Sequence, residues 1–178
     1  MTDKLVLSVV DQSPVRQGEP AANALRETVE LAQAAERLGY ARFWVAEHHN
    51  TGSFAGTSPE ILIGQIAAAT RRIRVGSGGV MLSHYSALKV AEQFSILNAF
   101  FPGRIDLGLG RAPGSDQLTA AALSYPRSQI DIRHFPQQVA DVLGYLHGTI
   151  GGDHPFARLR IQPGIPPETG PEVWLLGS

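Results

Sequence analysis

Residues 43–49, FWVAEHH, join a short apolar run to three side chains that can exchange protons or bind ions. Runs rich in aromatic and β-branched residues are usually buried strands. Polar groups directly after such a strand lie where a parallel α/β sheet places its ligands. We therefore expect a buried strand with Glu47, His48 and His49 at its carboxyl end. Acid–base chemistry is expected there, since an unperturbed imidazole titrates near pH ~6.5.

Two other interpretations of this cluster stay open at the level of the residues alone. Histidines at a strand end often serve only as hydrogen-bonding partners of their neighbours. A metal site is disfavoured, because adjacent strand residues point to opposite faces and no further ligand cluster is present in the sequence. His134, His147 and His154 fall in expected loops or helix ends and are predicted to lie on the surface.

Two more predicted strands are followed by residues that suit a binding site. Gly78-Gly79 follows the run 73–77, and glycine permits either a turn or a close approach of the backbone to a flat ring. Arg111 follows the run 105–110, and its forked guanidinium suits phosphate oxygens, although a solvated surface arginine has the same sequence pattern. His84 and Tyr85 come soon after the glycine pair and are expected near the same pocket.

The elements that must position these residues alternate between strand and helix. Apolar runs and helical patterns recur at a spacing of about thirty residues, which predicts a parallel sheet with crossover helices. The first run, 5–10, is almost continuously apolar and fits a strand buried on both faces. Predicted strands cover 5–10, 43–46, 73–77, 105–110 and 173–178. Predicted helices cover 22–38, 58–70, 87–99 and 136–146, and the long loop 111–134 has room for a short helix around 118–123.

Two architectures fit this alternation, an open doubly wound sheet and a (β/α)8 TIM barrel. No G-x-G-x-x-G follows the first strand, which removes the usual dinucleotide signal. Polar or glycine-rich residues follow four successive strands, as in barrels. A full barrel takes about 250 residues. The 178 residues are therefore expected to be the N-terminal part of a single barrel domain spanning 1–178, with about five strands and four helices and with exposed edge strands.

Composition excludes several function classes. Hydrophobic residues make up 43% and charged residues 17% of the chain, and the net charge is −1 without basic runs, which argues against binding to nucleic acid or acidic membranes. The absence of cysteine excludes disulfides and thiolate chemistry and suits a reducing cytoplasm. No signal peptide and no bilayer-length apolar stretch is seen, so a cytoplasmic location is expected.

Three motifs appear in order at the spacing of barrel strands: WVAEHH at 44–49, RVGSGGV at 74–80 and FPGRIDLGLGR at 101–111. Together with WLLGS at 174–178, they resemble the bacterial-luciferase-like flavin-dependent monooxygenases, over essentially the whole chain. The resemblance implies a (β/α)8 barrel in which reduced FMN and O2 oxidise a small organic substrate. It also implies a separate flavin reductase that supplies reduced FMN, and a homodimer that packs through early helices.

The resemblance implies roles for the histidine cluster. His48 matches the imidazole that faces flavin and substrate, where it would do acid–base work. Glu47 would orient or polarise His48, or would close a structural ion pair. His49 and His84 would line the substrate pocket.

The resemblance implies a cofactor site as well. Gly78–Gly79 matches a non-proline cis peptide that supports the flavin ring. Arg111 and Ser178 match contacts to the FMN phosphate, and Gly177 stands where some luciferases carry a glutamate. The rest of the phosphate site is expected beyond residue 178, so weak FMN binding by the 178 residues alone is predicted.

Two alternative functions stay open beside the monooxygenase. Relatives of this barrel use the deazaflavin F420 for hydride transfer and not for oxygen insertion. The third possibility is a non-catalytic chain that binds flavin weakly or serves as a dimer partner. The substrate is not predicted, because loops after later strands normally select it.

Overall fold

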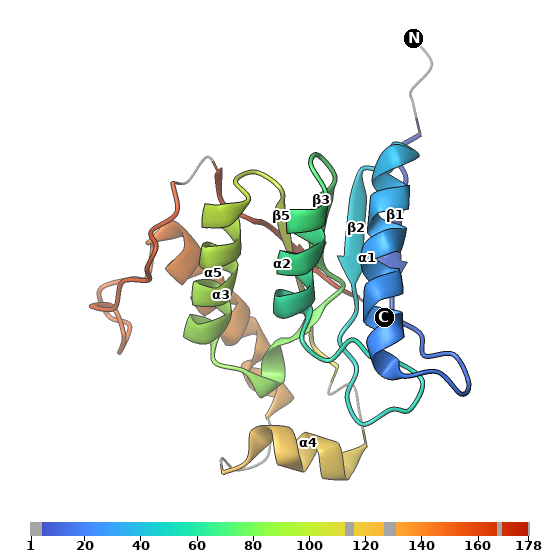
Figure 1. Cartoon of the computed structure of the whole chain (residues 1–178). Helices are drawn as coiled ribbons and strands as arrows, with labels where there is room; N and C mark the ends of the chain where they lie inside the picture. Colours follow the sequence, from blue (N-terminus) through green and yellow to red (C-terminus); the bar gives the residue numbers. More distant parts are fainter. Residues whose placement is uncertain (1–4, 113–115, 127–130, 167–168, 178) are drawn as a thin grey trace.

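A computed structural model describes residues 5–112, 116–126, 131–166 and 169–177, and its strands form one parallel sheet (Figure 1). The strands are β1 (Ser8–Asp11), β2 (Arg42–Val45), β3 (Arg74–Ser77), β4 (Val80–Met81), β5 (Ile105–Gly110) and β6 (Glu172–Leu175). The helices are α1 (Ala21–Arg37), α2 (Pro59–Ala69), α3 (Ala87–Phe100), α4 (Gln117–Ser124) and α5 (Phe135–His147), with 3-10 turns η1 (Leu82–His84) and η2 (Ile132–His134).

The sheet has the order β1-β2-β3-β5, and β6 pairs with β5 on its other side. Both β3 and β4 pair with β5, so they occupy one position in the sheet. Gly76 pairs with Asp106, and Val80 pairs with Leu109. The segment from β3 to β4 therefore advances four residues between these two pairs, while β5 advances three. One extra residue therefore bulges between β3 and β4, at the position of the glycine pair, and bulges often adjoin functional sites.

The core lies between the sheet and the helices that cover it. On α1 the buried residues Ala24, Thr28, Ala32 and Ala35 recur every three or four positions, so one face of small side chains packs inward. Gly39, with φ of +82°, follows the C-terminus of α1, as expected for a helix-ending glycine. The fully buried residues include Phe43, Val45, Ile63, Ile66, Val75, Phe94, Ile105, Leu107 and Leu109.

The predicted elements agree with the structure to within a few residues, with one error of environment. The run 5–10 was expected to be buried on both faces, and this is wrong. Leu5 is 78% exposed and precedes β1, and Val10 is 57% exposed because its side chain lies on the face of the sheet opposite to Val9, which packs against the core. Among the described residues no helix is long and apolar enough to cross a membrane.

A layer of charged side chains lies towards the amino ends of four strands. Asp106 on β5 is fully buried and accepts hydrogen bonds from Arg42 on β2 (2.8 Å) and from Arg74 on β3 (2.6 Å). Glu172 on β6 pairs with both arginines, at 2.8 and 3.2 Å. Parallel register makes this possible, because Arg42 aligns with Arg74 and Asp106 aligns with Glu172. We call these four residues the ionic layer.

Trp44 connects the ionic layer to the rest of β2. Its indole Nε1–H donates to Asp106 at 2.9 Å, and its ring lies 5.6 Å from that of Trp174 in an edge-on arrangement. A Cβ placed on Gly78 would touch the Trp44 side chain at 3.4 Å. The indole therefore lies between the ionic layer and the glycine pair.

Candidate active site at the carboxyl ends of the strands

The candidate site residues gather where parallel strands end. Glu47, His48 and His49 follow β2, the glycine pair lies between β3 and β4, and Arg111 follows β5. All of these strands run in the same direction, so their carboxyl ends share one edge of the sheet, the edge nearest to α4 in Figure 1. Asn50 donates to Asp116, the N-cap of α4, at 3.0 Å and joins that helix to the loop after β2.

Glu47 is the best-connected side chain of this edge. Its carboxylate is completely buried, yet it accepts from the backbone N–H of Met81 at 2.8 Å and from the Tyr85 hydroxyl at 2.5 Å. The His49 Nε2 lies 2.7 Å from the same carboxylate. Buried carboxylates require such partners, because an unpaired charge away from water is costly. Glu47 therefore ties the end of β2 to β4 and to the residue after η1.

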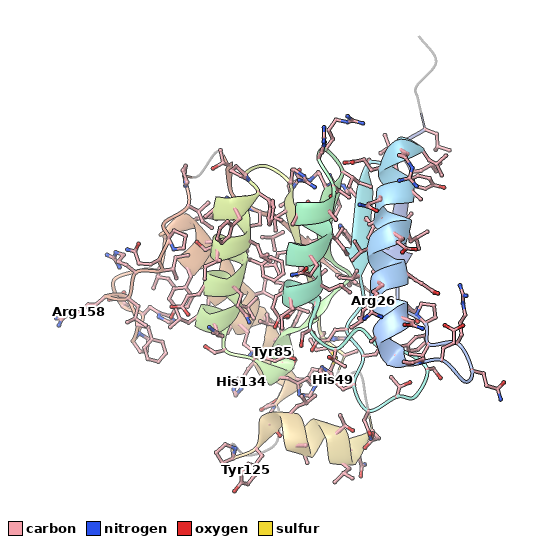
Figure 2. All side chains as sticks on the ribbon, in the orientation of Figure 1. Arg26, His49, Tyr85, Tyr125, His134 and Arg158 are labelled. Carbon is pink, nitrogen blue, oxygen red and sulfur yellow. The ribbon has the colours of Figure 1, made fainter. Side chains whose placement is uncertain are left out.

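Tyr85 is held in its neutral form by this contact. Burial raises the pKa of Tyr85 above its usual range, and the hydrogen bond to Glu47 together with the negative charge of that carboxylate raises it further. Figure 2 shows Tyr85 and His49 close together at the end of the sheet that faces α4, consistent with their shared partner Glu47.

His48 has a different environment from that of His49. Its ring stacks on Phe54 with 4.9 Å between the ring centroids, and its backbone N–H donates to the Gly56 carbonyl at 2.9 Å. Its buried Nδ1 has no hydrogen-bond partner among the described residues. Among the described residues no hydrogen bond joins the Glu47 and His48 side chains, so the role of Glu47 in orienting His48 stays a prediction. The Glu47 carboxylate lies 2.7 Å from His49.

The loop that carries Phe54 is fixed against the loop after β1. Pro14 and Phe54 form an antiparallel bridge, and Val15 donates to the Ser53 carbonyl at 2.8 Å. Phe54 could not be predicted from the sequence, because it is a single aromatic residue in a glycine-containing loop with no periodic pattern around it. Only the pairing of two loops far apart in the sequence reveals it.

The Gly78–Gly79 peptide is cis, as the resemblance implied. Both glycines are half-buried within an otherwise buried run, so part of this side-chain-free peptide is accessible. A Cβ on Gly79 would lie 2.8 Å from the Gly108 carbonyl oxygen, so the close approach of β5 itself requires glycine there. A Cβ on Gly78 would make only ordinary contacts, with Trp44 and Val10 at 3.4 Å.

Arg111 is exposed, and no hydrogen bond or ion pair joins its guanidinium to another described residue. Its neighbour Gly110 pairs with Met81 across the sheet, so Arg111 lies at the same edge as the glycine pair. The predicted phosphate contact Ser178 lies outside the described residues. Gly177 is described and exposed.

The remaining histidines differ in exposure, and Figure 2 shows His134 at the same end of the molecule as His49. His84 is only 1% exposed, so its ring does not reach the accessible surface and its place in a substrate pocket stays a prediction. His134 and His147 are exposed as predicted, whereas His154 is half-buried and lies 3.3 Å from Asp141. The described residues contain no group of three or more histidine or acidic side chains placed to bind a metal.

Comparison with known proteins identifies close relatives of the chain. It is 55% identical over 172 residues to the uncharacterised protein YwcH of Bacillus subtilis (strain 168) and 48% identical over 172 residues to an N-acetyl-S-alkylcysteine monooxygenase of the same organism. Both matches cover 97% of this chain and 51% of the relative. The crystal structure of apo-MsnO8 superposes with a TM-score of 0.87 at 45% identity, covering 98% of this chain and 50% of that one. The chain therefore spans about half the length of the curated relatives it matches.

More distant structures share the fold alone. The oxygenating constituent of 3,6-diketocamphane monooxygenase from Pseudomonas putida, in complex with FMN, superposes with a TM-score of 0.66 at 19% identity, covering 82% of this chain and 40% of that one. An F420-dependent secondary alcohol dehydrogenase, in complex with an F420–acetone adduct, gives 0.68 at 15% identity, covering 98% and 52%. A family model described as luciferase-like monooxygenase matches residues 5–178. The parallel α/β fold corresponds to part of a TIM barrel, and the chain belongs to the luciferase-like monooxygenase family.

Proposed function

We propose that this chain takes part in an FMN-dependent monooxygenase reaction, in which reduced FMN and O2 oxidise a small organic substrate. One observation carries the proposal. An unpartnered arginine and an accessible, side-chain-free peptide lie at the same edge of the sheet, beside a histidine with an unpartnered ring nitrogen. This edge combines a place for an anion, a flat surface for a ring and an acid–base group.

The residues present fit such a cofactor. Arg111 would bind the phosphate, because a free guanidinium offers several donors in the geometry that phosphate oxygens prefer. The Gly78–Gly79 peptide would support the flavin ring, since neither glycine has a side chain to occupy the space above it. Ser178 is proposed as a second phosphate contact. When bound, FMN would supply the chemistry that activates oxygen.

The chain's own residues would bind, orient and exchange protons. His48 is proposed to hold a proton at a ring nitrogen beside the substrate, with the Phe54 ring keeping the imidazole in one orientation. The loop that carries Phe54 and the helix α4 would restrict the access of water, because both lie over the carboxyl ends of the strands (Figure 1).

Titration of the purified chain with oxidised FMN and then with anaerobically reduced FMN tests the proposal. We expect saturable quenching of flavin fluorescence that is weakened in Arg111→Ala. The matched control is Arg158→Ala, because Arg158 is also exposed but lies on the opposite side of the molecule from His49 in Figure 2. Circular dichroism establishes that each variant is folded. A folded chain that binds FMN equally well with and without Arg111 would refute the phosphate assignment.

F420-dependent hydride transfer is the alternative that the same experiment can separate. Parallel titrations with FMN and F420, followed by anaerobic and aerobic turnover, distinguish the two reactions, because only oxygen insertion requires O2. An N-acetyl-S-alkylcysteine is a reasonable first substrate to test, since one relative at 48% identity is named for it.

Two partners are proposed in addition to the substrate. A separate flavin reductase would supply reduced FMN, and a second copy of the chain would form a homodimer. Light scattering tests the dimer, and stimulation of substrate oxidation by an added NADH-dependent flavin reductase tests the supply of reduced flavin.

A further inference from the structure

The two hydrogen bonds at one oxygen of Glu47 indicate which atoms carry protons. The Tyr85 hydroxyl and the His49 Nε2 both meet Oε1, while the Met81 N–H meets Oε2. With Tyr85 and Met81 both donating, a protonated carboxyl group would have to donate from Oε1 to His49 while the same oxygen accepts from Tyr85. An ionised carboxylate accepts from all three at once. The arrangement therefore fits an ionised Glu47 surrounded by donors.

This pattern indicates one tautomer of His49. If the carboxylate accepts at Oε1, the proton of the neutral imidazole lies on Nε2, and Nδ1 is left with a lone pair. No described residue hydrogen-bonds to that Nδ1, and the His49 side chain is 14% exposed. A carboxylate that fixes one imidazole nitrogen and leaves the other free is an arrangement that serves acid–base catalysis in unrelated enzymes.

We propose that Glu47 and His49 form an acid–base pair of the FMN site, in which Glu47 holds the Nε2–H tautomer and His49 Nδ1 exchanges a proton with a group bound at this edge. The inference rests on the proposed function and extends it to a second histidine. When Nδ1 takes up a proton, the positive imidazolium lies 2.7 Å from the buried negative charge of Glu47, which stabilises it. When the proton returns, the pair regains its starting state.

The neighbouring groups do not form a second carboxylate–imidazole pair. His48 lies against Phe54 and contacts no carboxylate, so no adjacent charge stabilises its protonated form. Tyr85 keeps its hydroxyl proton at working pH, because burial and Glu47 both raise its pKa, and it serves as a fixed donor. Glu47 acts through His49 and is therefore a positioning residue, whereas His49 carries the proton.

The closing experiment measures the tautomer directly. Long-range ¹H–¹⁵N correlation spectra of the ¹⁵N-labelled chain distinguish Nε2–H from Nδ1–H, and the His49 signals are assigned through its Cβ and backbone. We expect Nε2–H in the wild type. In Glu47→Gln the side-chain amide can donate to His49 Nε2, so we expect Nδ1–H there. An Nδ1–H wild type, or an unchanged tautomer in a folded Glu47→Gln variant, overturns the proposal.

A kinetic arm separates this inference from the proposed function. Reoxidation by O2 of reduced FMN bound to the chain is followed by absorbance in the wild type, Glu47→Gln and His49→Asn. We expect both variants to react about 10²–10⁴-fold more slowly, the usual range for loss of an acid–base group. His147→Asn, on the exposed face of α5, is the matched control and should react at the wild-type rate.

The outcomes are distinct. If the wild type binds no FMN, the proposed function fails, and with it the role of the pair in that reaction, whatever the tautomer. If FMN binds but Glu47→Gln and His49→Asn react at the wild-type rate, the acid–base pair is overturned while the proposed function stands. Tyr85→Phe keeps the Glu47–His49 contact, so it should retain the wild-type tautomer and lose less than about tenfold in rate. A Tyr85→Phe variant with the Nδ1–H tautomer would overturn the role given to Glu47.

Discussion

Replacing Asp106 with asparagine is expected to destabilise the chain more than any other single change to the ionic layer. The Asp106 carboxylate is completely buried and accepts from Arg42, Arg74 and Trp44. Asparagine keeps the shape of the side chain but removes the charge, and its amide group presents donors towards two guanidinium groups. Two partly buried arginines would then face each other without their common partner.

The structure sets the size of the effect. Removal of one partner from a buried ion pair costs about 3–5 kcal/mol of unfolding free energy. Arg42 and Arg74 are each 22% exposed, and Glu172 remains within reach of both, so we expect about 3 kcal/mol, at the lower end of that range. Glu172 is itself 46% exposed, and Glu172→Gln should cost no more than about 1 kcal/mol because solvent screens its charge.

Urea denaturation measures both values in the same way. Trp44 and Trp174 are the only tryptophans of the chain and both lie beside the ionic layer, so their fluorescence reports on this region. Far-UV circular dichroism reports on the helices, and coincident transitions support a two-state interpretation. The midpoint should fall in Asp106→Asn while the dependence on urea stays unchanged.

Two results would contradict the expected losses of stability in Asp106→Asn and Glu172→Gln. If Asp106→Asn loses less than about 1 kcal/mol of unfolding free energy, a buried carboxylate between two arginines stabilises the fold less than its geometry implies. If Glu172→Gln is as destabilising as Asp106→Asn, burial does not determine the contribution of these charges, and the network acts through its exposed member.

Four further substitutions test other parts of the structure. Burial raises the pKa of Glu36, but hydrogen bonds from the backbone N–H groups of residues 71–73 outweigh this effect and lower the pKa from 4.5 to about 2. The contribution of Glu36 to the free energy of unfolding is therefore fully present above pH 4.5 and is lost as the pH falls through about 2. Glu36→Gln should cost about 1–2 kcal/mol at pH 7 after allowance for its partial exposure, and equal stability of both forms at pH 7 would contradict this. Gly79→Ala should lose about 1–3 kcal/mol because its Cβ meets a backbone oxygen at 2.8 Å, whereas Gly78→Ala should fold normally and bind FMN more weakly; the reverse order in urea melts would refute the contact analysis. Phe54→Ala should weaken FMN-dependent turnover while leaving the unfolding midpoint within a few degrees, and unchanged turnover would show that the stacking on His48 has no catalytic role.

The elements with strong local signals are predictable from the sequence. β5 matches its predicted range because its apolar run is bounded by Pro102-Gly103 on one side and Arg111 on the other. The α2 helix begins at Pro59, where proline suits the first helical position. The run 5–10 was misjudged because hydrophobicity alone does not reveal whether both faces of a strand are covered by other elements.

The site is predictable only in part, for a physical reason. Parallel strands bring their carboxyl ends together, so the placement of Glu47, the glycine pair and Arg111 at one edge follows from strand order. Alternation along an extended chain would place residues 47 and 49 on one face, but β2 ends at Val45, so this pairing depends on the direction of the chain beyond the strand. The fold places His49 beside Glu47 and His48 beside Phe54.

β2 makes the two ends of the sheet depend on each other. The indole N–H of Trp44 donates to Asp106, and the Trp44 side chain would lie 3.4 Å from a Cβ placed on Gly78. If Asp106→Asn frees the indole, the surface beneath the Gly78–Gly79 peptide loses its support. Asp106→Asn should therefore weaken FMN binding even when the variant is fully folded. Glu172→Gln leaves the indole hydrogen bond intact and should not weaken FMN binding. Equal FMN affinity in the two folded variants would mean that the ionic layer stabilises the sheet without influencing the site.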